Sequence, residues 1–107
     1  MTLGQRQRLF AALVGTLITR AYLTGYEISL GAAFRTQAEA ERLGFKNSNH
    51  TRSLAIDLNL FRSGRYLQRT DEHRELGEWW EQQHELCRWG GRFGDGNHYS
   101  LEYKGVK

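Results

Sequence analysis

The sequence LAIDLNLF, residues 54–61, alternates between large apolar side chains and small or polar ones. Such alternation predicts a strand whose two faces differ, because successive side chains of a strand point to opposite sides of the sheet. One face must point into the core, and it carries Leu54, Ile56, Leu58 and Leu60. The other face carries Ala55, Asp57 and Asn59.

Asp57 lies in the middle of this apolar strand. A carboxylate there is costly unless it is paired or bound to a metal. The neighbouring small side chain of Ala55, on the same face, would leave room for a ligand. The alternative is that this face of the sheet is open to solvent, which is the commoner situation for an isolated aspartate in a strand. Asp57 alone does not decide between these two interpretations.

Periodicity and capping signals predict the elements around this strand. Helices are expected at residues 5–20, 36–44 and from 70 or 71 to about 87, and further strands at 26–30 and 97–103. A turn at residues 62–65 would let Tyr66 and Leu67 pair back onto the central strand. Strands and helices do not alternate regularly, so the expected fold class is α+β, a small antiparallel sheet with helices packed around it.

The composition fits one small domain, residues 1–107, with a formal net charge of +3. A basic surface suits an acidic partner, but no arginine-rich arm or RNA-binding signature is present, so we expect no nucleic-acid partner. The single cysteine, Cys87, excludes an internal disulfide and is expected to be a small buried hydrophobe rather than a nucleophile.

The amino-terminal segment, MTLGQRQRLFAALVG, is expected to form an amphipathic helix and not a secretory signal. Its apolar run is too short to span a bilayer, so no stable membrane insertion is expected. We therefore expect synthesis in the cytoplasm without a signal peptide, and a monomer.

Two histidines could complete a metal-binding set with Asp57, and a second aspartate lies near one of them in the sequence. His50 lies in the loop that feeds the central strand, His98 opens the last strand, and Asp95 lies three residues before it among glycines. Two histidines and one carboxylate form a complete ligand set for catalytic zinc, with the fourth position left to water, although other divalent ions also accept such a set. The remaining histidines, His73 and His84, are expected on helix surfaces.

The pattern Ser48-x-His50-x-x-Ser53-x-Ala55-x-Asp57, followed by Asp95-x-x-His98-Tyr99, resembles the zinc DD-peptidase family. This family includes D-alanyl-D-alanine carboxypeptidases of the vancomycin-resistance type and the L-alanyl-D-glutamate endopeptidases used as phage endolysins, and it has the hedgehog/DD-peptidase fold. Phe34-Arg35-Thr36 matches its upstream arginine motif, and the segment from Trp89 to His98 is similar to the phage branch in particular. The pattern departs from the family at Ser53, where many members have glycine.

The resemblance implies a role for each matching residue. His50, Asp57 and His98 would bind one zinc ion, Asp95 would be the catalytic acid/base, and Arg35 would stabilise the oxyanion. Ser48 would orient His50 or touch substrate. The aromatic residues Trp89, Phe93 and Tyr99 either line the substrate groove or belong to the core.

The function expected from this resemblance is hydrolysis of peptidoglycan stem peptides. A phage endolysin that cuts the L-alanyl-D-glutamate bond is the first hypothesis, because it needs no signal peptide when a holin releases it to the cell wall. A D-alanyl-D-alanine carboxypeptidase is the alternative within the same class. A non-catalytic cell-wall-binding relative is the contrasting hypothesis, which an intact Asp95 disfavours.

Overall fold

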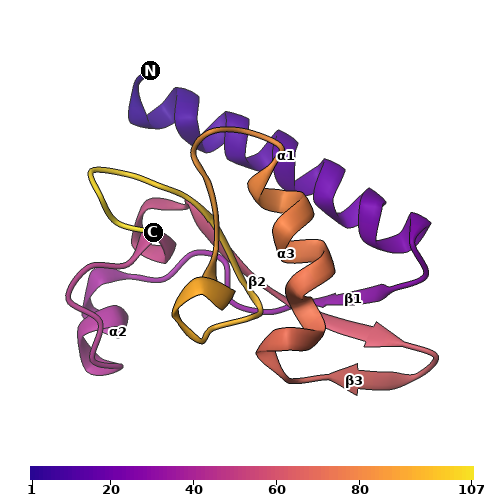
Figure 1. The fold of residues 1–107 in the computed structure, drawn as a ribbon. Helices are drawn as coiled ribbons and strands as arrows, with labels where there is room; N and C mark the ends of the chain where they lie inside the picture. The colour runs from indigo at the N-terminus through magenta and orange to yellow at the C-terminus, as the bar shows by residue number, and fades with distance from the viewer.

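A five-stranded antiparallel sheet forms the centre of the computed structural model, which describes residues 1–107 (Figure 1). The strands are β1 (Glu27–Leu30), β2 (Ala55–Arg62), β3 (Arg65–Leu67), β4 (Cys87–Trp89) and β5 (His98–Leu101). Their order is β1-β2-β5-β4, and β3 pairs with β2 across the expected turn. The predicted α+β class and the central position of the 54–61 strand are confirmed.

The register between β2 and β5 places Asp57 directly opposite His98. Residues opposite each other in an antiparallel pair have side chains on the same face of the sheet. The side chains of Leu54, Leu58 and Leu60 are fully buried, which confirms the predicted core face. Asp57 and His98 therefore lie side by side on the face of the sheet away from this core.

Three α-helices accompany the sheet. Helix α1 (Leu3–Leu23) is capped by Thr2, whose hydroxyl accepts from the backbone N–H of Gln5, and it extends a few residues beyond the predicted 5–20 at each end. Helix α2 (Gln37–Arg42) begins where the capping signal predicts, because the Thr36 hydroxyl accepts from the backbone N–H of Glu39. It ends before the expected boundary at residue 44. No helix combines the length with the apolar composition that a transmembrane span requires.

The predicted helix from residue 70 or 71 to 87 is too long at its carboxyl end. The chain forms a short 3₁₀ helix, η2 (Thr70–His73), then α3 (Arg74–Glu81), and it enters β4 at Cys87. The sequence holds no glycine or proline between residues 82 and 87 to stop a helix. Pairing of residues 87–89 with β5, and burial of Cys87, outweigh this local preference.

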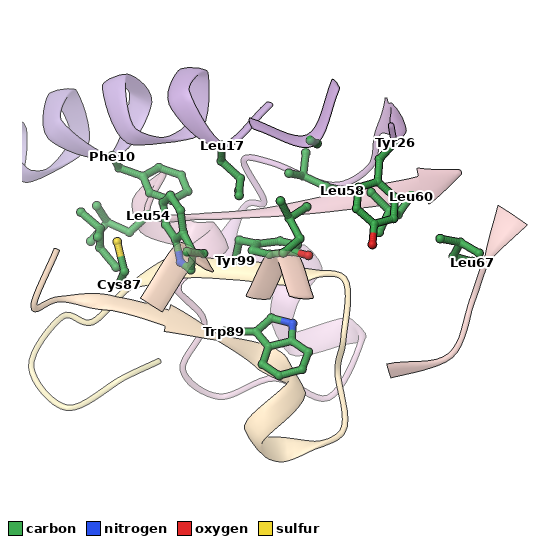
Figure 2. Packing of buried hydrophobic residues seen from close by; sticks show 14 residues of the cluster. Phe10, Leu17, Tyr26, Leu54, Leu58, Leu60, Leu67, Cys87, Trp89 and Tyr99 are labelled. Atoms are coloured by element: carbon green, nitrogen blue, oxygen red, sulfur yellow. The ribbon is translucent and has the colours of Figure 1, made fainter. Parts of the chain in front are cut away.

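The hydrophobic core lies between the sheet and the helices α1 and α3 (Figure 2). Phe10 of α1 packs edge-on against Trp80 of α3, with ring centroids 6.0 Å apart, and Trp80 packs in the same way against Tyr99 of β5 at 6.3 Å. Burial raises the pKa of the Cys87 thiol to about 12, as expected for a cysteine that serves as a small core residue.

Candidate metal centre and its cleft

Two side chains from the sheet and one from a loop converge on the polar face of β2. Asp57 and His98 are the cross-strand pair, and His50 arrives on η1 (Asn49–Arg52), a short 3₁₀ helix. The Ser48 hydroxyl caps that helix by accepting from the backbone N–H of His50 at 3.2 Å. His50 Nε2 lies 3.3 Å and His98 Nδ1 lies 3.7 Å from Asp57 Oδ1. One donor atom from each residue lies within 4.8 Å of the other two.

In each histidine ring, one nitrogen points away from Asp57 and contacts a main-chain oxygen. This contact indicates that the other nitrogen faces the Asp57 carboxylate with a lone pair. His50 Nδ1 lies 2.8 Å from the Ala33 carbonyl, and His98 Nε2 lies 3.3 Å from the Lys107 carbonyl. A carbonyl only accepts, so in the neutral rings these nitrogens carry the hydrogen. The inward nitrogens of both rings are then acceptors that face Asp57 Oδ1, a buried oxygen without any hydrogen-bond partner. A divalent cation placed between three such acceptors would satisfy all of them.

Burial by itself would raise the pKa of Asp57, but hydrogen-bond donation and positive charge from the rings of His50 and His98 in their protonated form lower it by more. The net effect holds this pKa well below its ordinary range, so the carboxyl group stays ionised at neutral pH. An ionised carboxylate is the form that binds a metal.

The three side chains lie at the bottom of a cleft of about 340 Å³. Asp95 stands at its wall, with Oδ2 3.9 Å from His98 Nδ1 and 54% of the side chain exposed. The position of Asp95 depends on Gly90, because a Cβ there would collide with the Asp95 carbonyl oxygen. The Gly90 carbonyl in turn accepts from the backbone N–H of Asp95 at 2.9 Å. The glycine-dense loop thus brings a solvent-accessible carboxylate beside the ligand cluster.

Arg35 also lines the cleft. Its backbone N–H donates to the His50 carbonyl at 3.1 Å, which ties the segment before α2 to the histidine-bearing 3₁₀ helix. The guanidinium lies over the ring of Phe45, 5.4 Å from its centroid. This cation–π contact favours a position of the guanidinium at the cleft.

A family model described as D-alanyl-D-alanine carboxypeptidase matches residues 42–101. The chain belongs to this carboxypeptidase family. The matched segment includes the three clustered side chains and Asp95, whereas Arg35 precedes it. Membership places the protein among peptidases that act on peptidoglycan, and it agrees with a metal-binding cluster of two histidines and one aspartate.

The crystal structure of the L-Ala D-Glu endopeptidase ChiX from Serratia marcescens is similar to this chain. It is 22% identical over 88% of this chain and 80% of that chain, with a TM-score of 0.58. The two proteins therefore share a fold. No curated protein matches the sequence.

Six residues with roles predicted from the family resemblance, five from the main pattern and one from the upstream arginine motif, line one cleft. They are Arg35, Ser48, His50, Asp57, Asp95 and His98. Their juxtaposition agrees with the prediction, and their individual roles stay predictions.

The predicted substrate contacts of Trp89 and Tyr99 are wrong. Trp89 is 1% exposed and donates its indole N–H to the Gly96 carbonyl, and Tyr99 is 0% exposed. Tyr99 alternates with His98 along β5, so its side chain points to the core face of the sheet. Phe93, which is 52% exposed, does line the cleft.

His73 is also placed differently from the prediction of a helix-surface residue. It is 2% exposed, and its Nδ1 lies 2.9 Å from the Tyr99 hydroxyl. His84 is partly exposed, and its Nδ1 accepts from the backbone N–H of Leu86. Neither ring belongs to the cluster.

Sequence reasoning missed four residues of the cleft wall, which are Phe45, Asn47, Asn49 and Lys107. Asn47 lies next to the histidine motif, so its polar loop was a usable signal. Phe45 and Lys107 carry no local signal, because only the folding of the chain around the cleft brings them there.

Proposed function

We propose that this protein is a zinc-dependent endopeptidase that cuts the L-alanyl-D-glutamate bond of peptidoglycan stem peptides and acts as a phage endolysin. The observation that carries this proposal is the convergence of His50, Asp57 and His98 in one cleft, with Asp95 at its wall. A non-catalytic relative would have no need for an exposed carboxylate beside the ligand cluster.

His50 Nε2, Asp57 Oδ1 and His98 Nδ1 are the atoms that would hold the metal. Two imidazoles and one carboxylate suit zinc, and the rings are already fixed by carbonyls at their other nitrogens. Bound zinc supplies a Lewis acid and lowers the pKa of a coordinated water to roughly 7.

Asp95 would act as general base and then general acid. Its exposed carboxylate accepts a proton from the attacking water and later delivers it to the nitrogen of the leaving amine. The Arg35 guanidinium, held over Phe45, would stabilise the negative charge that develops on the carbonyl oxygen of the cleaved bond. Arginine stays charged throughout, so this stabilisation needs no proton transfer.

The walls of the cleft suit an anionic peptide. Arg35 supplies positive charge, and the aromatic rings of Phe45 and Phe93 supply apolar surface. Stem peptides carry carboxylates that would be attracted by this cation. Structural similarity to an L-Ala D-Glu endopeptidase favours the internal bond, whereas the family description favours removal of a terminal D-alanine as the second candidate.

For the biological role, we propose synthesis in the cytoplasm of an infected host and action on the cell wall after release. The net charge of +3 supports attraction to an anionic envelope. We further propose a monomer that binds its peptidoglycan substrate and no nucleic acid.

The test is mass spectrometry of fragments released from purified Gram-negative sacculi by the zinc-loaded protein. The Asp95→Asn variant is the inactive control, and Asp71→Asn, which removes an exposed carboxylate paired with Arg69, is the matched control. New termini between L-alanine and D-glutamate in wild type and Asp71→Asn, and not in Asp95→Asn, are expected. Release of D-alanine alone would establish the carboxypeptidase alternative, and no cleavage would reject both.

A further inference from the structure

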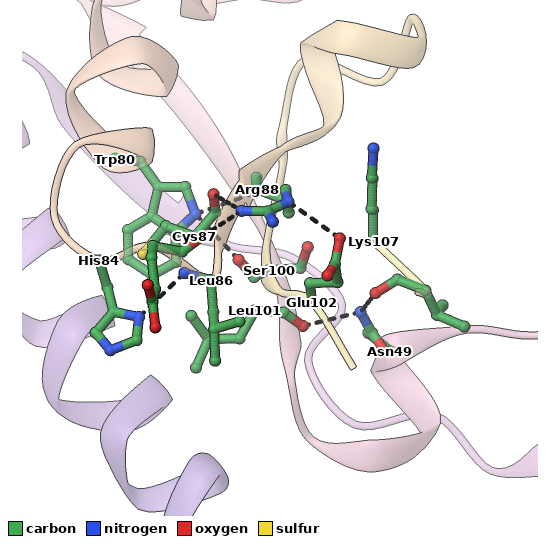
Figure 3. Close-up of polar contacts among 12 residues, drawn as sticks. Asn49, Trp80, His84, Leu86, Cys87, Arg88, Ser100, Leu101, Glu102 and Lys107 are labelled. Carbon is green, nitrogen blue, oxygen red and sulfur yellow. Dashed lines mark hydrogen bonds and ion pairs between the residues drawn. The ribbon is translucent and has the colours of Figure 1, made fainter. Parts of the chain in front are cut away.

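The side chain of Asn49, which lines the same cleft directly before His50, joins three segments of the chain. It is 1% exposed, and its amide Nδ2 donates to the carbonyls of Leu101 at 3.0 Å and Val106 at 2.8 Å (Figure 3). A flipped amide would direct its oxygen at two carbonyl oxygens, so chemistry fixes this orientation. Both amide hydrogens of Asn49 are therefore used to hold backbone.

Each of the three joined segments either carries a predicted ligand or contacts one. Asn49 itself immediately precedes His50 on η1. Leu101 is the last residue of β5, which begins at His98. Val106 immediately precedes Lys107, whose carbonyl lies 3.3 Å from His98 Nε2. The amide thus links the segment that carries one histidine to the segment that orients the other.

We infer that Asn49 is a positioning residue for the metal centre. Its side chain sets the distance between the two histidines and keeps the Lys107 carbonyl against the His98 ring. This inference rests on the proposed function, in which both histidines bind zinc. A histidine ligand needs its second ring nitrogen held so that the first points at the metal. The fixed acceptor for His98 comes from a segment that Asn49 holds in place.

The segment that supplies this acceptor is a turn closed by reciprocal hydrogen bonds between Tyr103 and Val106, each 2.9 Å long. Gly105 lies in it with φ +79°, and no atom would lie within 4 Å of a Cβ placed there. Gly105→Val would therefore strain the turn through its backbone conformation, and the added Cβ would meet no neighbouring atom.

The test measures zinc affinity, by competition with a chromophoric chelator, for Asn49→Ala and Gly105→Val. Each variant has a matched control. Tyr99→Phe removes a buried hydrogen bond from the same strand, and Gly64→Val strains another open turn, with φ +76°, in the β2–β3 hairpin. Thermal unfolding of each metal-free protein in chelator reports folding separately from metal affinity.

We expect the zinc dissociation constant to rise at least ~10-fold in Asn49→Ala and Gly105→Val, and to stay within ~2-fold of wild type in both controls. If Asn49→Ala fails to fold, Gly105→Val decides the question alone. Wild-type affinity in Gly105→Val, or an equal loss in the controls, would overturn the positioning role while leaving the proposed function intact. A wild-type protein that binds no zinc would instead reject the metal-dependent function, and the inference with it.

Discussion

Replacing Asp57 with asparagine should change the stability of the protein in opposite directions with and without zinc. In the metal-free protein at pH 8, where an imidazole is ordinarily neutral, Asp57 Oδ1 is a buried oxygen that faces the lone pairs of two rings. An asparagine amide in the same place would donate a hydrogen bond to His50 Nε2. The same change removes the anionic ligand from the proposed zinc set.

The two effects have different sizes. A buried polar atom without a partner costs about 1–3 kcal/mol, and because 21% of the Asp57 side chain is exposed we take the lower end, about 1 kcal/mol. For a domain of this size that gain raises the melting temperature by about 4 °C. Zinc at 100 times its dissociation constant stabilises wild type by about 2.7 kcal/mol, or about 10 °C, and this increment should vanish in Asp57→Asn.

Differential scanning fluorimetry in chelator and in excess zinc measures all four melting temperatures. Asp57→Asn should melt above wild type in chelator and below it in zinc. A zinc-induced shift as large as that of wild type would show that Asp57 is not a ligand. A lower melting temperature than wild type in chelator would refute the argument from the unpartnered oxygen.

Three further outcomes are expected. Asp95→Asn should keep the zinc-induced rise in melting temperature while its turnover of stem peptide falls by about 10²–10⁴-fold, and near-normal turnover in a kinetic assay would remove Asp95 from the reaction. Ser53→Gly should raise the free energy of unfolding in a urea titration by about 0.5–1 kcal/mol, because Ser53 has φ +55°, and a decrease would contradict this. Burial lowers the pKa of His73 below 6.5, so the neutral ring stabilises the fold above about pH 6.5, and this contribution is lost as pH falls below that value. Melting temperatures measured in chelator from pH 8 to 5 should fall more steeply for wild type than for His73→Leu. Parallel plots of melting temperature against pH would contradict this contribution of His73.

The features that sequence predicted best are those set by local periodicity. The alternation in residues 54–61 identified the central strand and its core face, and the Thr36 capping signal identified the start of α2. Family resemblance, rather than periodicity, selected which two of the four histidines accompany Asp57. The structure adds the register in which Asp57 faces His98, and this register depends on pairing between segments about 40 residues apart.

Features that depend on distant packing were not predictable from the sequence. Residues 82–87 lack a helix stop, and only their approach to β5 converts Cys87 and its neighbours into a strand. His73 looks like an ordinary polar helix residue, yet it is buried, and the Tyr99 hydroxyl lies 2.9 Å from its Nδ1. Such a polar pair within the core leaves no periodic signal along the chain.

The three predicted ligands differ in what holds them. Asp57 and His98 are fixed by strand pairing inside the sheet, so their separation changes only if the sheet itself does. His50 instead arrives on a four-residue 3₁₀ helix, whose place depends on the Ser48 cap, the Asn49 amide and the left-handed turn at Ser53. Substitutions that alter the geometry of the site without altering its ligands should therefore concentrate in residues 48–53.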